Sequence, residues 1–138
     1  MKPPPRAIAL VVALQAAGVA AADGAVPARI GYNEHIQPIL AENCFHCHGP
    51  DAATRKAKLR LDRAEFATKP RAGGDLEAAI VPGKPAVSPL IERIKTTDPE
   101  EVMPPPEVHK RLKPEEIALL ERWVAEGAEY QGHWAFEK

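Results

Sequence analysis

One run of five residues, Cys44-Phe45-His46-Cys47-His48, constrains this chain more than any other feature. It has the form C-x-x-C-H and contains both cysteines of the protein. Two thiols at this spacing can add to the two vinyl groups of one porphyrin, and the histidine that follows then faces the iron. The pattern is the attachment motif for a c-type haem. The sequence therefore predicts one covalently bound haem c at Cys44 and Cys47, with His48 as the proximal iron ligand.

The C-x-x-C spacing alone also occurs in redox-active dithiols and in zinc sites. A closed zinc site on Cys44, Cys47 and a histidine needs a fourth ligand, and the chain has neither a second cysteine pair nor an H-x-x-x-H spacing. A disulfide between the two cysteines would close a very short loop and stabilise the fold little. Capture by a cofactor is the favoured use of both thiols, with zinc binding and dithiol chemistry as alternatives.

The N-terminal residues have the pattern of a secretory signal peptide. Lys2 and Arg6 precede an almost unbroken apolar run at residues 7–21, and small residues lie where cleavage would occur. We predict a signal peptide at residues 1–22, a linker at 23–31 and one domain at 32–138. No transmembrane helix is expected in the mature chain, because this run is short for a bilayer and no later segment is as apolar. The predicted location is the periplasm or the cell envelope.

Composition narrows the classes of partner and the way in which the chain can fold. The formal net charge is −1, and it becomes more negative if Lys2 and Arg6 leave with the signal peptide. An acidic surface binds polyanions poorly, so nucleic acid is not an expected partner. Aromatic residues make up only 5% of the chain, and 15 residues are prolines. We expect a haem to supply much of the core that this composition lacks.

The segment before the motif is predicted to be helical, because Ile36, Ile39 and Leu40 recur at helical spacing. Asn33 is the expected N-cap. Pro38 lies too far along for a regular first turn, so an irregular or bent start is expected. We interpret His35 as a solvated histidine rather than an iron ligand.

Further helices are predicted in the second half of the chain, after a single turn at residues 65–68. Ser88 and Pro89 open one helix as its cap and first residue. In this helix the residues expected to be buried are Leu90, Ile91 and Ile94, and those expected to face water are Glu92, Arg93 and Lys95. The last helix begins near Pro114 and ends near Gly127. Its predicted buried face consists of Ile117, Leu120, Trp123 and Val124.

Met103 is the only methionine that remains once Met1 has left with the signal peptide. Three prolines follow it, and their fixed φ angles stiffen the loop. A flexible side chain on a stiff loop is well suited to present a ligand, although methionine more often fills gaps in a core. Met103 is therefore predicted to be the distal iron ligand, and a histidine in its place is the alternative.

A cluster of basic residues follows the motif within a short span: Arg55, Lys56, Lys58, Arg60 and Arg63. Such a cluster can serve as a docking patch or can bind haem propionates. The favoured interpretation is a solvated loop face.

The chain resembles the planctomycete-type cytochrome c domain, a variant of the class I cytochrome c fold found at the start of long exported proteins. The matching segments are residues 32–33 with 39–40, residues 44–52, 59–62, 80–83 and 103–106, Leu112 with residues 114–120, and residues 127–136. The resemblance implies an all-α, class I cytochrome c-like helical domain around one covalently bound haem. It also implies a loop-rich insertion between the haem motif and the distal methionine loop.

The resemblance assigns thioether links to Cys44 and Cys47, proximal ligation to His48 and distal ligation to Met103. It implies further domains after the C-terminal residues, so the redox partner is another protein or the rest of a longer polypeptide. We expect an electron carrier module, which is not itself an enzyme although it can belong to a larger redox enzyme, because two axial ligands suppress oxygen chemistry. The alternative is a haem enzyme or gas sensor with an open or labile sixth position, with His109 and His133 as remote proton-handling candidates.

Overall fold

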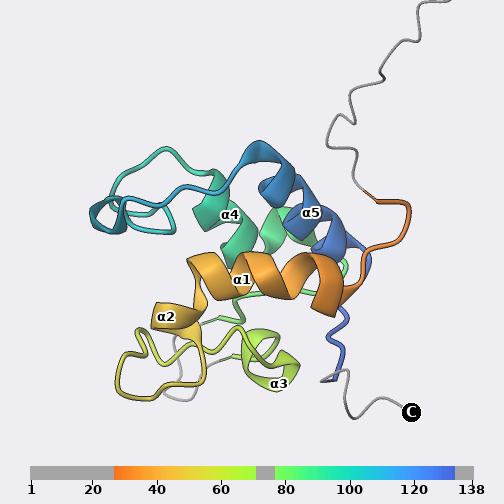
Figure 1. Cartoon of the computed structure of the whole chain (residues 1–138), viewed down its shortest axis with the longest axis horizontal. Helices are drawn as coiled ribbons and strands as arrows, with labels where there is room; N and C mark the ends of the chain where they lie inside the picture. The colour runs from red at the N-terminus through yellow and green to blue at the C-terminus, as the bar shows by residue number, and fades with distance from the viewer. Residues whose placement is uncertain (1–26, 71–76, 133–138) are drawn as a thin grey trace, which may run out of the picture.

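The protein is built from short helices joined by long loops (Figure 1). The computed structural model describes residues 27–70 and 77–132, and these two ranges contain no strand. The elements in chain order are η1 (Tyr32–Ile36), α1 (Gln37–Asn43), α2 (Phe45–His48), α3 (Ala64–Ala67), η2 (Pro85–Val87), α4 (Pro89–Lys95), η3 (Pro106–Val108) and α5 (Pro114–Ala125). This agrees with the predicted all-α class.

Two expectations from the sequence fall at the ends of the chain. The predicted signal peptide and the first residues of the linker lie outside the described residues, as does His133. Within the described ranges, no helix is long and apolar enough to cross a membrane.

The first helical rod joins two geometries, as the position of Pro38 predicts. η1 is a π-helical turn, and α-helical geometry begins at Gln37, which places Pro38 in the first α-helical turn. A proline costs no helical hydrogen bond there, because the first N–H groups of an α-helix have no partner within it. Figure 1 shows η1 and α1 as one continuous rod. The side chains of Ile36 and Leu40 are fully buried, so one face of the rod packs on the core.

The expected N-cap at Asn33 is wrong. Gly31 occupies the N-cap position, and Asn33 lies inside η1. The Asn33 side chain donates a hydrogen bond to the carbonyl of Gly132 at 2.8 Å, and its backbone N–H donates to Oε1 of Gln131 at 2.9 Å. The residue therefore ties the C-terminal segment to the start of the rod instead of capping a helix.

His35 is also less solvated than expected. Its side chain is 22% exposed, and its Nδ1 accepts the backbone N–H of Gly31 at 3.0 Å. This bond satisfies one of the N–H groups that precede the helix. His35 thus makes a local hydrogen bond at the start of η1.

Ser88 precedes α4 as predicted, but its hydroxyl does not cap the helix. The Ser88 Oγ accepts the N–H of Val81 at 2.9 Å and donates to the carbonyl of Lys84 at 3.0 Å. The residue is only 1% exposed, so these bonds satisfy polar groups that water does not reach. Ser88 therefore fixes the turn that leads into α4.

The last helix, α5, has the predicted start and end. Glu116 accepts the N–H of Lys113 at 2.7 Å, which satisfies one free donor at the N-terminus. After the helix, Gly127 has a φ of +111°, a conformation that glycine adopts without strain. Leu120 and Val124 are fully buried, and burial of such side chains contributes about 1.5–3 kcal/mol each.

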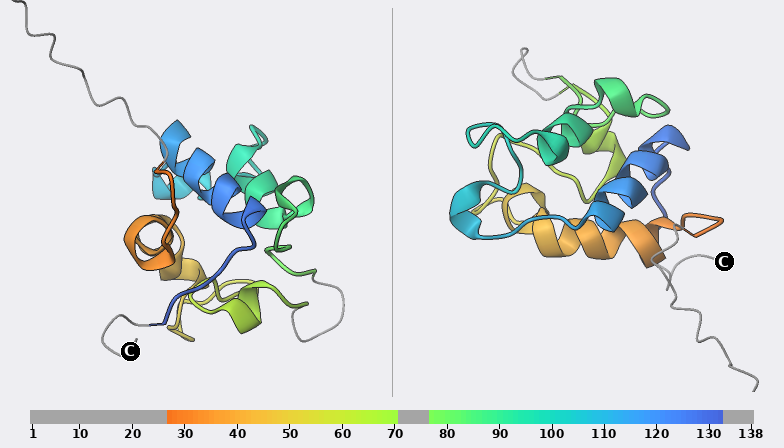
Figure 2. Two further views of the ribbon diagram at one scale, coloured as in Figure 1. Left: turned by 90° about the vertical axis from the view of Figure 1, so that its right-hand side faces the viewer. Right: turned by 90° about the horizontal axis from the view of Figure 1, so that it is seen from above.

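Helix α5 packs across α4 and η1, as the views in Figures 1 and 2 show. At the contact with η1, the rings of Tyr32, Trp123 and Tyr130 form a cluster with centroids 4.6 to 5.7 Å apart. The Tyr130 hydroxyl donates to the carbonyl of Leu61 at 3.0 Å, which joins this cluster to the loop after the motif. The aromatic cluster therefore closes the end of the rod opposite the C-x-x-C-H sequence.

Candidate cofactor site

The C-x-x-C-H residues form a compact turn at the end of α1. Cys44 separates α1 from α2, and its carbonyl accepts the N–H groups of Cys47 at 3.1 Å and His48 at 2.8 Å. These bonds hold the two cysteines and the histidine within one helical turn. Gly49 then follows so closely that a β-carbon there would overlap the carbonyl oxygen of Phe45. The backbone thus presents both sulfur atoms and the imidazole from a single short segment.

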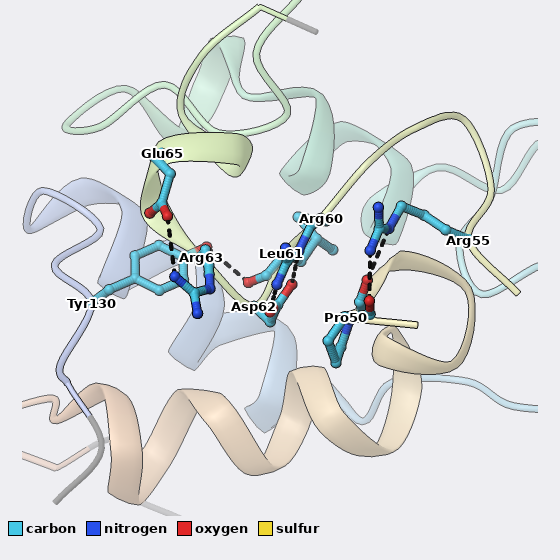
Figure 3. A network of polar contacts seen from close by, with 9 residues as sticks. Pro50, Arg55, Arg60, Leu61, Asp62, Arg63, Glu65 and Tyr130 are labelled. Carbon is cyan, nitrogen blue, oxygen red and sulfur yellow. Dashed lines mark hydrogen bonds and ion pairs between the residues drawn. The ribbon is translucent and has the colours of Figure 1, made fainter. Parts of the chain in front are cut away.

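The loop that follows is hydrogen-bonded back to this turn. The N–H of Lys56 donates to the carbonyl of Cys47 at 2.7 Å, and the N–H of Leu61 donates to the carbonyl of His48 at 2.8 Å. The Arg55 guanidinium donates to the carbonyls of Gly49 at 3.1 Å and Pro50 at 2.6 Å (Figure 3). The loop therefore fixes the backbone on both sides of His48.

The basic cluster is solvated in part, as expected, because Lys56, Lys58 and Arg63 are exposed, whereas Arg55 and Arg60 are half-buried and bind partners within the chain. Arg60 makes two hydrogen bonds to the carboxylate of Asp62, at 3.0 and 2.6 Å, and the two side chains are 20% and 15% exposed (Figure 3). Burial acts to raise the pKa of Asp62, but hydrogen bonds and charge from Arg60 outweigh it and hold that pKa below its usual value. Lys56 and Lys58 are exposed, so only part of the cluster is a solvated surface.

Two cavities meet at the predicted site residues. One has a volume of about 280 Å³ and the other about 270 Å³, and Cys44, His48 and Met103 line both. The first is also lined by Glu42, Asn43, His46, Cys47, Pro104, Pro105, Val108 and Lys110. The second is also lined by Ala57, Leu59, Leu61, Ala79, Pro89, Leu90, Arg93 and Ile94. The fold thus brings Met103 to the motif from a distant part of the sequence.

The lining of these cavities fits a flat, largely apolar ring attached at one edge. Leucine, isoleucine, proline and alanine side chains form most of the wall of the second cavity. Both cysteines lie in the wall of the first, where thioether links to such a ring would form. Each cavity lies just below the range of about 300–1,000 Å³ that is usual for ligand pockets, and the shared residues make them parts of one crevice. The two thiols are the groups that attach a c-type haem, and an imidazole with a thioether is the pair of ligands that cytochromes c supply to its iron.

The environment of Cys44 does not favour the thiolate form of its side chain. Burial, with a smaller contribution from the charge of Cys47, raises the pKa of the Cys44 thiol to about 12. Redox-active cysteines need a lowered pKa, because the thiolate is the attacking species. Zinc chemistry also lacks support, since the described residues contain no group of three or more histidine, cysteine, aspartate or glutamate side chains placed to hold a metal ion.

The loop that carries Met103 is fixed on both sides of the methionine. Val102 is 3% exposed and Pro104 is buried, while Met103 itself is half-buried and faces the crevice. The N–H of Met103 donates to the carbonyl of Arg93 on α4 at 2.9 Å. Farther along, Nζ of Lys110 donates to the carbonyl of Glu42 in α1 at 2.7 Å. Both walls of the crevice are therefore joined through this loop.

Sequence reasoning missed one polar residue of the crevice. Arg93 was expected to face water, and its side chain is 43% exposed, but it also lines the second cavity beside Leu90 and Ile94. The signal was present, because Arg93 follows Leu90 by three residues and so lies on the same helical face. Of the other described histidines, His109 is exposed outside both cavities, and His46 is exposed but lines the first cavity together with Met103.

Comparison with known proteins gives one match. Residues 44–107 match the sequence model of a family described as planctomycete cytochrome C. The matched segment begins at the first cysteine of the motif and includes Met103 and the prolines after it. No curated protein and no solved structure matches the chain.

Proposed function

Since the chain carries a planctomycete-type cytochrome c domain, we propose that it is an exported carrier of single electrons, with one covalently bound haem c in the crevice. The observation that carries this proposal is the convergence of Cys44, His48 and Met103 on both cavities. The family match supports haem binding and electron transfer.

Four residues have assigned roles in this proposal. Cys44 and Cys47 form thioether bonds that attach the porphyrin to the backbone turn. The His48 imidazole and the Met103 sulfur would bind the iron. When bound, the haem supplies a metal centre that gains and loses one electron without bond changes in a substrate.

The surrounding residues keep this centre in a carrier role. With both axial positions filled by protein atoms, small molecules such as O2 have no free coordination site. The soft thioether of Met103 favours the reduced state, and the leucine and isoleucine side chains of the crevice exclude water. The hydrogen bonds of Lys56 and Leu61 keep the His48 backbone in place, so little rearrangement accompanies electron transfer.

The first test uses protein matured in a host that attaches haem. The absorption spectrum of the reduced protein should show the sharp bands of low-spin haem, and this colour should survive acid–acetone extraction because the haem is covalently bound. Colourless protein, or protein that contains zinc and no iron, would overturn the proposal.

The second test addresses Met103. Met103→Ala should convert the haem to a high-spin form that binds carbon monoxide and imidazole readily, because a coordination site becomes free. The absorption spectrum measures this change. An unchanged spectrum would exclude Met103 as a ligand, and wild-type protein that binds carbon monoxide at once would favour a gas-binding or enzymatic site.

The partner and location are part of the same proposal. The signal-peptide pattern at residues 1–22 supports export to the periplasm or the cell envelope, where the two cysteines can receive haem. The electron is then exchanged with a separate redox protein or with further domains of the same polypeptide.

A further inference from the structure

Arg93 is the charged residue that α4 contributes to the wall of the crevice. Its side chain is 43% exposed, so its stem lines the second cavity while its guanidinium reaches the loop before Met103. Every other lining residue contributed by α4 is apolar: Pro89, Leu90 and Ile94. Arg93 is thus the one charged side chain that α4 contributes to the lining of this cavity.

Its partners are two residues of the methionine loop. The Arg93 carbonyl accepts the N–H of Met103 at 2.9 Å. The guanidinium Nη1 donates to the carbonyl of Glu101 at 3.1 Å, and Nη2 lies 3.9 Å from the Glu101 carboxylate. One residue of α4 thus contacts the loop through both its backbone and its side chain.

Hydrogen bonds within residues 98–102 hold the loop before Met103 together. The carbonyl of Asp98 accepts the N–H groups of Glu101 at 3.1 Å and Val102 at 2.9 Å. The Asp98 carboxylate accepts the N–H of Glu100 at 2.9 Å. Because residues 98–102 are already bonded to one another, an anchor at Glu101 restrains the position of Met103 as well.

We infer that Arg93 is a positioning residue that holds the Met103 sulfur over the crevice by clamping the methionine loop to α4. This inference rests on the proposed function, in which Met103 is the distal ligand. Movement of the loop away from α4 would carry the Met103 sulfur out of the crevice, and that movement would break the bonds to Arg93. Loss of the guanidinium therefore raises the fraction of molecules in which the axial position is open.

The experiment measures how tightly imidazole binds the ferric holoprotein, because imidazole binds only when the sulfur has left. The apparent affinity is proportional to the open fraction. Arg93→Gln keeps the aliphatic stem and removes the charged donors, and it should tighten imidazole binding about tenfold, which is the scale of one partly exposed hydrogen bond to a charged group. Arg93→Lys should fall between wild type and Arg93→Gln, because lysine keeps the charge but cannot form the same fork.

The control is Arg63→Gln. Arg63 is an exposed arginine that pairs with Glu65 at 3.5 Å and lies outside both cavities of the crevice. It should leave imidazole affinity at the wild-type value. Circular dichroism and the covalent haem content should match wild type in all three variants, so that a change in affinity reports loop position and not loss of fold.

The outcomes separate this inference from the proposed function. Met103→Ala serves as the reference with no sulfur: if it binds imidazole no more tightly than wild type, the ligand assignment fails and the clamp fails with it. If Met103→Ala binds much more tightly but Arg93→Gln equals wild type, the clamp alone is overturned. If Arg93→Gln leaves the imidazole affinity unchanged but alters the reduction potential, the guanidinium would be assigned to the haem propionates. That result would also overturn the clamp.

Discussion

Among single residues, Asp62 shows most clearly how the fold controls an ionisable group. Its carboxylate receives both hydrogen bonds of the Arg60 fork, and the Arg60 guanidinium also lies 4.9 Å from the centre of the Phe66 ring. Arg60 and Asp62 are two residues apart, so the loop must bend to let them meet. The pair therefore stabilises the bend that places Leu61 between the crevice and the hydroxyl of Tyr130.

Asp62→Asn should lower the free energy of unfolding at pH 7 by roughly 1 kcal/mol, after allowance for solvent screening of a partly exposed pair. The folded-state pKa of Asp62 is lowered from its usual value, which is about 3.9 in unfolded chains. The carboxylate thus stabilises the fold above about pH 4, and this contribution is lost as the pH falls through the folded-state pKa. Urea unfolding at several pH values checks the effect.

The difference between wild type and Asp62→Asn should shrink as the pH falls below about 4. Glu65→Gln is the control, because Glu65 belongs to a longer and more exposed pair with Arg63. It should change stability by less than about 0.5 kcal/mol at any pH. A difference for Asp62→Asn that does not depend on pH would contradict the role given to its ionised form.

Some residue positions were predicted from the sequence and others were not. The spacing of Cys44, Cys47 and His48 is a local pattern, so the sequence alone predicted haem attachment there, and the structure adds that the three residues lie within one compact turn. Arg93 was assigned to the solvent because charged residues usually face water. Its partner, Glu101, lies in a loop whose path depends on tertiary contacts. No local sequence pattern therefore predicted the contact between Arg93 and Glu101.

At the level of elements, the junction between α2 and its following loop is the tightest part of the site. Gly49 lies directly after His48, and its backbone passes close to the carbonyl of Phe45. The N–H of Leu61 then bonds to the His48 carbonyl. Any shift of Gly49 therefore moves the histidine that is predicted to bind iron.

Gly49→Ala should destabilise the holoprotein by about 1–3 kcal/mol, because the new β-carbon must displace backbone rather than a flexible side chain. Thermal unfolding followed by circular dichroism measures this loss. Gly31→Ala is the matched control: a β-carbon there meets no atom closer than 3.6 Å, and we expect a change within about 0.5 kcal/mol. Equal losses in both variants would show that the close approach to Phe45 has no special cost.

The helices themselves were predicted to different degrees. Helix α5 was predicted well, because Pro114, the acidic first turn and Gly127 mark its ends within the local sequence. Helix α4 was predicted with the correct start, but the Ser88 hydroxyl binds the preceding turn instead of the helix. The π-helical geometry of η1 was not predicted beyond an irregular start, and neither were the hydrogen bonds of Asn33 to residues 131–132, which are distant in the sequence.

For the whole molecule, the decisive feature is a core that surrounds a crevice. Helices α1, α4 and α5 pack at one end, and the Tyr32, Trp123 and Tyr130 rings fill that end. The described residues between the motif and Met103 are largely loop. A porphyrin in the crevice would contact loops from both halves of the chain and would hold them together.

Cys44→Ala and Cys47→Ala together should abolish covalent haem and most of the helical signal, because a ligand that binds only the folded state stabilises it. Far-ultraviolet circular dichroism and the haem spectrum after acid–acetone extraction check this. Lys56→Gln, an exposed change in the loop next to the motif, should keep both signals. A well-folded protein without haem would contradict the dependence of the fold on its cofactor.

By itself, the sequence determined what depends on neighbouring residues: the attachment turn, the ends of α4 and α5 and the stiff loop at Met103. These follow from hydrogen bonds, fixed φ angles and apolar spacing within a few residues. Only the tertiary structure decided how distant segments meet: it brings the loop of Met103, which the sequence predicted as a ligand, to one crevice with Cys44 and His48, and it joins the Arg93 guanidinium to Glu101. Such contacts form when several elements pack together, so no short stretch of sequence predicts them.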